Sequence, residues 1–275
     1  MKNSQGEIQR VLNGSLPKIE FPEQMLQACP FCYTKHPIIV RGFVKNPETQ
    51  EAKIIEDRGY SFCNCKNIWY TDWDNTDLRV YDNKYREKYN IDQTRVLFDT
   101  CCKDHFPIFK AHNKNIKNFL DIGAIHNGIL DNAKKEGWDT TGLDINPSTS
   151  DGIHKRYIGN VEDSESLSYL ENFDIIWASH IFEHLKNPLI TLENLFNKLN
   201  PSGMLYIAMP DPFFIDWAHP YNWGHWTLRE HHIFWDLQSF IEESEKIGFK
   251  CVYKNRNLVA HYICTMDFQV IFQKL

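Results

Sequence analysis

Short apolar runs alternate with helical patterns from about residue 115 onward. The runs are bounded by Gly, Asp, Asn or Pro, which is typical of strands buried on both faces. They cover residues 116–122, 140–143, 156–158, 173–178 and 204–209. The helical patterns cover residues 127–136, 163–171, 188–199 and 236–247. This alternation predicts an α/β fold with a mostly parallel sheet covered by helices.

The C-terminal segment breaks the alternation. Residues 249–254 and 265–272 are strand-like, and no helical pattern separates them, so they are predicted to pair antiparallel. Gly248 precedes the first of them and fits the C-terminal cap of a helix that ends near Lys246.

Composition and charge narrow the classes of function. The 275 residues are 42% hydrophobic, 24% charged and 14% aromatic, which is typical of an ordered globular protein. A formal net charge of −6 offers no positive field for a phosphate backbone, so no nucleic-acid partner is expected. No apolar run approaches the roughly 18 residues of a membrane span, and the N-terminus is polar. We therefore expect a cytoplasmic protein without a membrane partner.

Four cysteines form two close pairs near the N-terminus. Cys29 and Cys32 stand in a Cys-x-x-Cys spacing, and Cys63 and Cys65 follow in a tighter Cys-x-Cys spacing. Four thiolates satisfy tetrahedral Zn²⁺ and leave no open position, so the pattern predicts a structural rather than a catalytic zinc site. Two alternatives stay open. In the first, one ligand of the second pair is replaced by Cys101, Cys102 or His36. In the second, the cysteines bind no metal and pack as small apolar residues.

A glycine turn follows the first predicted strand. Gly123 and Gly128 match two glycines of a dinucleotide-binding turn, but Ile125 occupies the place of the glycine that admits a pyrophosphate. Asp121 would repel a pyrophosphate but suits the ammonium of an amino-acid-bearing cofactor, and Asp144 ends the next strand, where it can bind a ribose. The pattern indicates an adenosine-containing cofactor; the alternative is a sharp strand-to-helix turn without a ligand.

Four segments together resemble the class I S-adenosylmethionine-dependent methyltransferases. They are Phe-Leu-Asp-Ile-Gly at 119–123, Gly-Leu-Asp at 142–144, the run 173–185 with its Glu-His-Leu ending, and the run 200–210 before and within the fifth strand. The resemblance implies a Rossmann-like, seven-stranded, mostly parallel sheet with an antiparallel C-terminal strand, preceded by a small zinc-binding lobe.

The resemblance also implies the residues that bind S-adenosylmethionine. The methionyl end would lie near the turn after the first strand, the ribose at the end of the second, the adenine after the third, and the sulfonium above the end of the fourth. The implied residues are Asp121, Gly123, Ala124, Asp144, Ile145, Asn160, Val161 and Ser179. Glu162 is an alternative to Asn160 for the adenine amino group.

The turn departs from the family at Ile125 and Asn127, where its members usually carry glycine. Asn127 is expected to tolerate a left-handed backbone. Ile125 has no such advantage, which keeps open a non-catalytic protein that binds the cofactor weakly or acts as a scaffold.

Three zones are expected along the chain. They are a cysteine-rich zinc lobe over residues 1–75, a helical lid or connector over 76–112, and the methyltransferase domain over 113–275. Tyr81, Tyr85 and Tyr89 recur every four residues and share one helix face, which either covers the cofactor or packs on the core.

An aromatic and histidine-rich stretch, residues 211–235, follows the fifth predicted strand. Its flat aromatic side chains suit a sugar ring or another amphipathic substrate, or they seal the core. These are Trp217, Tyr221, Trp223 and Trp226. The stretch also offers four histidines that can titrate near neutral pH, His219, His225, His231 and His232.

Methyl transfer to a hydroxyl needs a base that takes up a proton near neutral pH, for which histidine is suited. A carbon acceptor needs a base that forms a carbanion or an enolate, and both chemistries stay open. The candidates are His180, His225 and His231. The cysteine-bearing N-terminal lobe of this chain resembles the lobe that precedes the methyltransferase domain in sugar C-methyltransferases. The resemblance implies a small-molecule acceptor such as a sugar nucleotide or glycan precursor. An RNA or protein methyltransferase is the further alternative, although charges between Cys29 and Cys65 nearly cancel.

Overall fold

The computed structural model describes residues 38–45, 52–62, 67–70, 91–146, 152–215, 223, 225, 231–257 and 266–275. The chain divides into two compact units, and each is built from two separate stretches of sequence. The smaller unit comprises Met1–Thr76 and Asp211–Asp236, and the larger comprises Asp77–Pro210 and Leu237–Leu275. The stretch rich in aromatic residues and histidine is therefore grouped with the N-terminal part of the chain.

The smaller unit contains an antiparallel sheet in the order β1-β2-β3-β9. Its strands are β1 (Ile38–Lys45), β2 (Ala52–Phe62), β3 (Ile68–Tyr70) and β9 (Ile233–Phe234). Both residues of β9 are fully buried, and the Asp236 amide donates a hydrogen bond of 2.9 Å to the Asn67 side chain. The end of the aromatic stretch is thus held by strand pairing to residues far earlier in the chain.

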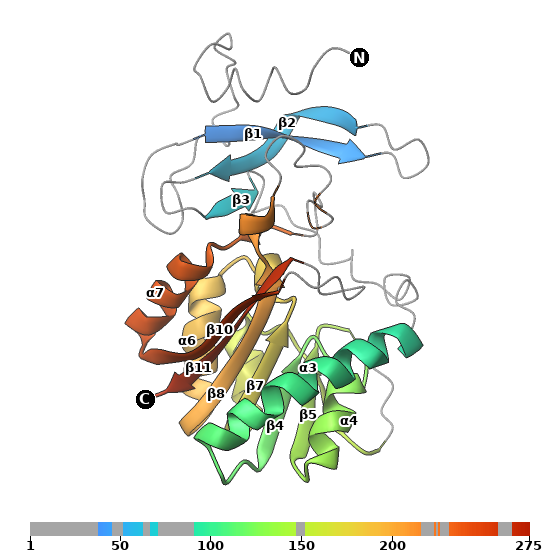
Figure 1. Ribbon diagram of the computed structural model, residues 1–275, viewed down its shortest axis with the longest axis vertical. Helices are drawn as coiled ribbons and strands as arrows, with labels where there is room; N and C mark the ends of the chain where they lie inside the picture. Colours follow the sequence, from blue (N-terminus) through green and yellow to red (C-terminus); the bar gives the residue numbers. More distant parts are fainter. Residues whose placement is uncertain are drawn as a thin grey trace. The chain divides into compact units, whose positions relative to one another are not determined.

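The larger unit contains a seven-stranded sheet in the order β10-β11-β8-β7-β4-β5-β6 (Figure 1). The strands are β4 (Asn118–Ile122), β5 (Asp139–Asp144), β6 (Lys155–Ile158), β7 (Phe173–Ser179), β8 (Leu199–Pro210), β10 (Phe249–Asn257) and β11 (Asp267–Lys274). From β8 to β6 neighbouring strands run parallel, whereas β11 runs antiparallel to both β8 and β10. The predicted fold class and the predicted C-terminal antiparallel pair are confirmed.

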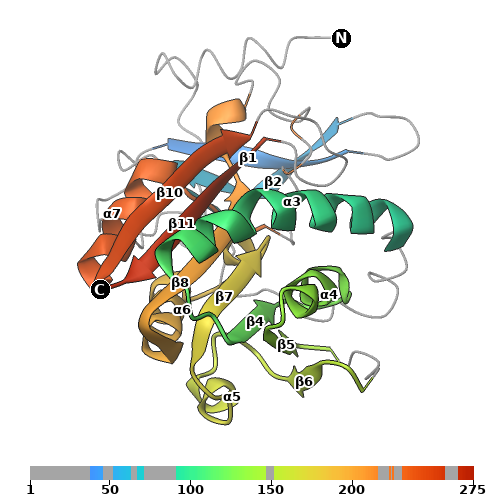
Figure 2. The ribbon, with the colours of Figure 1, turned by 60° about the horizontal axis from the view of Figure 1, so that its bottom comes forward.

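Helices cover both faces of this sheet, as Figure 2 shows. One face carries α3 (Ile91–His112) and α4 (Gly128–Lys135). The other carries α5 (Ser164–Ser168), α6 (Pro188–Lys198) and α7 (Leu237–Ile247). Gly248 follows α7 with a φ of +118°, as expected of a residue that ends a helix. Among the described residues, no helix is both long enough and apolar enough to cross a membrane.

Some strands and helices begin or end at other residues than predicted. The strand predicted to begin at 116 begins at 118, because the Asp174 carboxylate accepts hydrogen bonds from the Lys117 and Asn118 amides at 2.7 and 3.0 Å. Strand β8 begins at Leu199, five residues before the predicted start. Part of the predicted connector is the long helix α3, which packs against α4.

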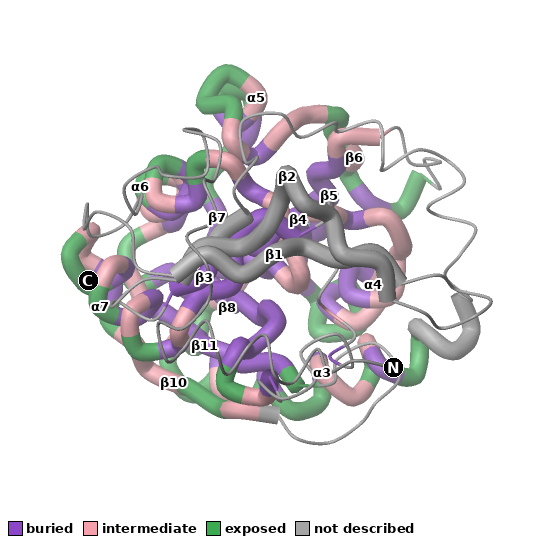
Figure 3. Tube along the Cα trace, turned by 90° about the horizontal axis from the view of Figure 1, so that it is seen from above, coloured by how far each residue is buried: buried purple, intermediate pink, exposed green. Residues whose placement is uncertain are grey.

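Aromatic side chains build the core between α3 and the sheet. Phe106 and Phe109 of α3 are buried against Trp177 of β7, and Trp177 stacks on Tyr206 of β8 with ring centroids 3.7 Å apart. The central strands β4, β7 and β8 are buried along most of their length (Figure 3). This packing fixes the positions of the strand ends, and hence of the loops that follow them.

Candidate functional site

The order of the strands creates a switch point between β4 and β7. From β4 the chain builds outward through β5 and β6, and then returns to place β7 and β8 on the opposite side of β4. In open α/β sheets ligands bind in the crevice beyond the carboxyl ends of strands at such a point. Asp121 near the end of β4, Asp144 at the end of β5 and Ser179 at the end of β7 all belong to this edge.

The backbone amides of the turn after β4 are bonded within the protein. The amides of Gly123 and Ala124 donate to the Leu143 carbonyl at 2.8 and 3.3 Å, and the Ile125 amide donates to the Gly123 carbonyl at 2.7 Å. Two of these hydrogen bonds tie the start of the turn to the end of β5, and the third closes the turn on itself.

Steric limits explain the two glycines of this turn. Gly123 has a φ of +74°, in the left-handed region, and a Cβ there would collide with the Ile181 side chain. A Cβ at Gly128 would collide with the ring of Phe98, which α3 packs against the start of α4. Gly128 is therefore required by the packing of α3 on α4.

The expectation of a left-handed backbone at Asn127 is wrong. Asn127 has φ −78° and ψ −6°, which is right-handed, and it occupies the N-cap position of α4. Its side-chain oxygen accepts a hydrogen bond from the guanidinium of Arg156. Asparagine serves here as a hydrogen-bond acceptor and not as a substitute for glycine's conformational freedom.

Two buried carboxylates lie at this edge. Burial raises the pKa of Asp121 well above its usual value, Arg156 opposes that rise, and the negative charge of Asp144 adds to it. Asp144 accepts a hydrogen bond of 2.7 Å from the Asn146 amide, which fixes its side chain beside Ile145. A buried acid such as Asp121, whose environment disfavours its charge, marks a candidate functional site.

The loop after β6 holds the predicted adenine contacts. The Asn160 side-chain oxygen accepts a hydrogen bond of 3.0 Å from the Glu162 amide, and Val161 is buried. The Glu162 carboxylate accepts a hydrogen bond from the Asn187 amide at the start of α6. One of the two lone pairs of the Asn160 side-chain oxygen is thus used within the loop, and the second can accept from an adenine amino group.

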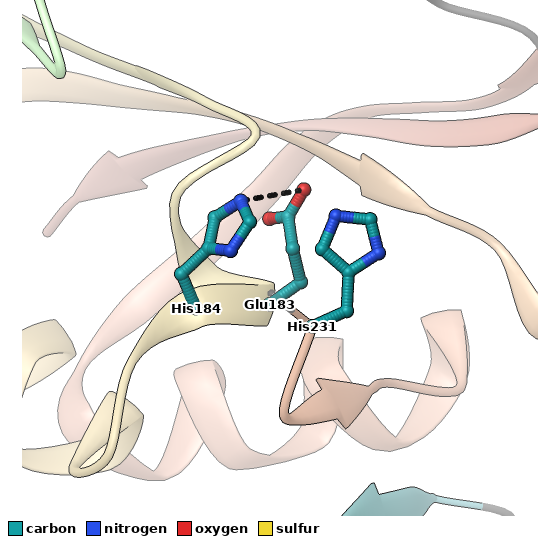
Figure 4. A group of neighbouring side chains, drawn as sticks. All are labelled: Glu183, His184 and His231. Atoms are coloured by element: carbon teal, nitrogen blue, oxygen red, sulfur yellow. Dashed lines mark ion pairs between the residues drawn. The ribbon is translucent and has the colours of Figure 1, made fainter. Parts of the chain in front are cut away.

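His180, the first candidate base, follows β7 with a φ of +55°. Its Nδ1 lies 3.0 Å from Oε1 of Glu183, and its Nε2 lies 3.1 Å from Oδ2 of Asp267. Both acids are fully buried. An imidazole donates from both ring nitrogens only when it is protonated, so this geometry suits a histidinium between two carboxylates. The histidine of the Glu-His-Leu ending, His184, places its Nε2 3.9 Å from Oε1 of Glu183 (Figure 4).

The other candidate bases, His225 and His231, belong to the smaller unit. Nδ1 of His231 lies 2.7 Å from the His225 carbonyl, and their ring centroids are 5.9 Å apart. Trp223 is buried against Phe234, with centroids 4.8 Å apart, so this tryptophan packs inside its unit. The structure thus groups His225 with His231 and places His180 in the larger unit.

Several predicted residues lie outside the described part of the chain. They are the zinc ligands Cys29, Cys32, Cys63 and Cys65, the alternative ligand His36, the helix residues Tyr81, Tyr85 and Tyr89, and Trp217, His219, Tyr221 and Trp226. Of the alternative ligands, Cys101 and Cys102 lie in α3. Cys102 is buried in the aromatic core, and burial and the charge of Asp121 raise its pKa, which favours the protonated thiol over a thiolate ligand.

Two further residues contact the site and were not predicted from the sequence. Arg156 lies in β6 and reaches the turn after β4, while Asp267 begins β11 and reaches His180. Both contacts depend on which strands are neighbours and in which register. A charged residue within a short predicted strand was the one available signal for Arg156.

Comparison with known proteins agrees with this architecture. A family model described as a methyltransferase domain matches residues 86–254. A ubiquinone biosynthesis O-methyltransferase from Histophilus somni is 26% identical over 60% of this chain and 74% of that protein. A SAM-dependent methyltransferase from Archaeoglobus fulgidus superposes with a TM-score of 0.52 at 20% identity, covering 70% of this chain and 100% of the other. The plantazolicin methyltransferase BamL, solved with a triazolic desmethylPZN analogue and SAH, gives 0.53 at 11% identity, covering 71% and 92%.

Proposed function

Because the chain belongs to the class I S-adenosylmethionine-dependent methyltransferases, we propose that it transfers a methyl group to a hydroxyl of a small molecule. The observation that carries the proposed cofactor site is the pair of buried acids, Asp121 and Asp144, at the switch point of the sheet. We assign the cofactor to the crevice beyond β4, β5 and β7.

The chemistry of these residues fits S-adenosylmethionine. A carboxylate at the end of the second parallel strand suits the two ribose hydroxyls, which is the role we assign to Asp144. Asp121 suits the ammonium of the methionyl group, since a desolvated carboxylate gains most from a nearby cation. Gly123 and Ala124 would contact the methionyl end, Ile145, Asn160 and Val161 the adenosine, and Ser179 the region of the sulfonium.

The bound cofactor supplies an electrophilic methyl group, so the protein has to align the acceptor and remove its proton. Alignment accounts for a large part of such a rate enhancement. We assign proton removal first to His180, which acts as a base only as the neutral imidazole; it would first have to lose one proton and exchange that carboxylate contact for the acceptor hydroxyl. His225 and His231 are the other candidates for this role.

Two observations bear on the chemical class of the methyl acceptor, and they favour different molecules. The relative from Histophilus somni is named for O-methylation in ubiquinone biosynthesis, which supports transfer to an oxygen of a small molecule, such as a hydroxyl. The resemblance of the cysteine-bearing lobe to sugar methyltransferases supports a sugar nucleotide, and four cysteine thiolates in that lobe would hold a structural Zn²⁺. The net charge of −6 supports a small molecule over a nucleic acid.

Calorimetric titration with S-adenosylmethionine and S-adenosylhomocysteine tests the cofactor site. Asp144→Ala is expected to weaken binding at least about tenfold, since it removes a charged hydrogen-bond partner worth about 1.5–3 kcal/mol. Asp139→Ala is the matched control, because Asp139 begins the same strand and is exposed. Equal affinity of the Asp144 variant and the wild type would refute the assigned site.

Release of S-adenosylhomocysteine then identifies the acceptor from a panel of catechols, other phenols and sugar nucleotides. Turnover with one class and not the other decides between the two acceptors. Tight cofactor binding without turnover on any of them would contradict the proposed transfer and indicate a non-catalytic cofactor-binding protein.

A further inference from the structure

The guanidinium of Arg156 reaches from the edge of the sheet to the turn after β4. Arg156 lies in β6, which pairs with β5, and β5 pairs with β4. Its Nη1 donates a hydrogen bond of 2.7 Å to the Ala124 carbonyl, and its Nη2 donates to the Asn127 side chain. One side chain thus holds two positions of the turn.

Gly142 provides the space for this contact. It is the β5 partner of Arg156 in the strand register, and a Cβ at this position would lie 2.5 Å from Nη1 of Arg156 and 2.9 Å from the Cβ of Ala124. A distance below 3.0 Å forces atoms to move. The absence of a side chain at Gly142 is therefore what allows the guanidinium to cross β5 and reach the turn.

The charge of Arg156 also acts on the buried acids. Asp121 faces Asp144 from β5, the Cys102 thiol from α3 and Arg156 from β6. Asp144 raises the pKa of Asp121, and Arg156 lowers it. Arg156 thus favours the ionised form of the carboxylate that we assign to the cofactor ammonium.

We propose that Arg156 is a positioning residue that holds the turn 123–127 in its cofactor-binding conformation, where related turns rely on additional glycines. This inference rests on the proposed function. The turn carries Ile125 and Asn127 in place of flexible residues. Arg156 bonds to the backbone carbonyl of the residue before Ile125 and to the side chain of Asn127 after it. A planar guanidinium donates in two fixed directions at once, which the single ammonium of lysine does not match.

The test compares Arg156→Met, Arg156→Lys and Gly142→Ala with the wild type by titration with S-adenosylhomocysteine. Arg156→Met is expected to weaken binding about tenfold, the equivalent of one lost charged hydrogen bond. Gly142→Ala is expected to have a similar effect, because the new Cβ displaces the guanidinium. Lys155→Met is the control: Lys155 is the exposed neighbour in β6, and its ion pair with Glu171 lies at the surface.

Two further readouts separate positioning from general destabilisation. Hydrogen–deuterium exchange of the turn amides in the cofactor-free protein is expected to accelerate in Arg156→Met and not in Lys155→Met. As the pH is lowered, the affinity for S-adenosylhomocysteine is expected to begin to fall at a higher pH in Arg156→Met than in the wild type. The reason is that without Arg156 the pKa of Asp121 rises, so its charge is lost earlier as pH falls. Arg156→Lys keeps the charge and is expected to retain the wild-type pH profile while it binds more weakly.

Unchanged affinity, exchange and pH profile in Arg156→Met would overturn the inference while leaving the proposed function intact. If the wild-type protein binds neither cofactor form, the proposed function fails, and the role of Arg156 in cofactor binding fails with it. If Arg156→Met does not fold, Arg156→Lys and Gly142→Ala decide, and wild-type affinity in both overturns the inference.

Discussion

The Nε2 atom of His180 lies 3.1 Å from the Oδ2 atom of Asp267, although the two residues are 87 positions apart in the chain. The contact joins the end of β7 to the start of β11, which lies beyond β8 in the sheet. Asp267 is fully buried, and His180 is a partner that compensates the charge of its carboxylate.

Asp267→Ala is expected to destabilise the protein by about 3 kcal/mol, because it leaves the ring of His180 without one of its two buried carboxylates. Asp267→Asn keeps the volume and an acceptor oxygen, so it should cost less. Urea denaturation at neutral pH measures both. Asp139→Ala, at an exposed site 3.9 Å from Lys134, should change stability by no more than about 0.5 kcal/mol. A loss below about 1 kcal/mol for Asp267→Ala would contradict the assigned ion pair.

Asp121→Asn is expected to stabilise the protein at neutral pH while it abolishes cofactor binding. The pKa of Asp121 is raised above its ordinary value of 3.8 in the folded protein, so folding becomes less favourable as pH rises above that value. The variant lacks this penalty, and its advantage should amount to about 1.4 kcal/mol per unit of pKa difference. Urea denaturation near pH 4 and near pH 8 measures the difference. An advantage that is equal at both pH values would contradict the assignment.

His105 should make the protein sensitive to mild acid. Burial lowers the pKa of His105 below its ordinary value of 6.5, so the unfolded chain takes up this proton more readily than the folded one. Stability is therefore lost as pH falls from 6.5 through the lower pKa of the folded state. His105→Phe fits the surrounding rings of Tyr206 and Tyr253 and removes the titration. The variant is expected to lose less stability than the wild type between about pH 6.5 and 5, measured by denaturant titration.

Gly128→Ala is expected to cost about 2 kcal/mol, because the new methyl group collides with the ring of Phe98. The double variant Gly128→Ala with Phe98→Ala removes the collision. Its loss of stability should therefore be smaller than the sum of the two single losses, by more than about 0.5 kcal/mol. Strict additivity in a thermal or denaturant cycle would show that Phe98 does not press on the start of α4.

The sequence was sufficient to predict the sheet, its antiparallel end and most helix positions, because the strands of the larger unit are buried and bounded by turn residues. The run 173–178 is an example: all of its residues are buried in β7. Assignment to the methyltransferase family followed from four motifs in a fixed order, and the match over residues 86–254 confirms it. The cofactor-binding and catalytic residues stay predictions that the experiments above address.

Side-chain contacts across strands could not be predicted in the same way. The reach of Arg156 to Asn127 requires the register of β6 on β5 and the space above Gly142. The backbone of Asn127 was expected to be left-handed from residue preference alone, whereas the observed backbone is right-handed and Asn127 directly precedes α4. The general tolerance of asparagine for a left-handed backbone therefore did not predict the conformation next to α4, which begins at Gly128.

The pairing of β3 with β9 sets an order of events for chain synthesis. Asn67 and Asp236, joined by a hydrogen bond, are 169 positions apart, and the parallel strands β4 to β8 lie between them in sequence. The three earlier strands of the small sheet therefore emerge from a ribosome long before their fourth partner exists. Until residues 233–234 are made, the edge of β3 is exposed to other chains, which makes this interval the period of greatest risk for aggregation.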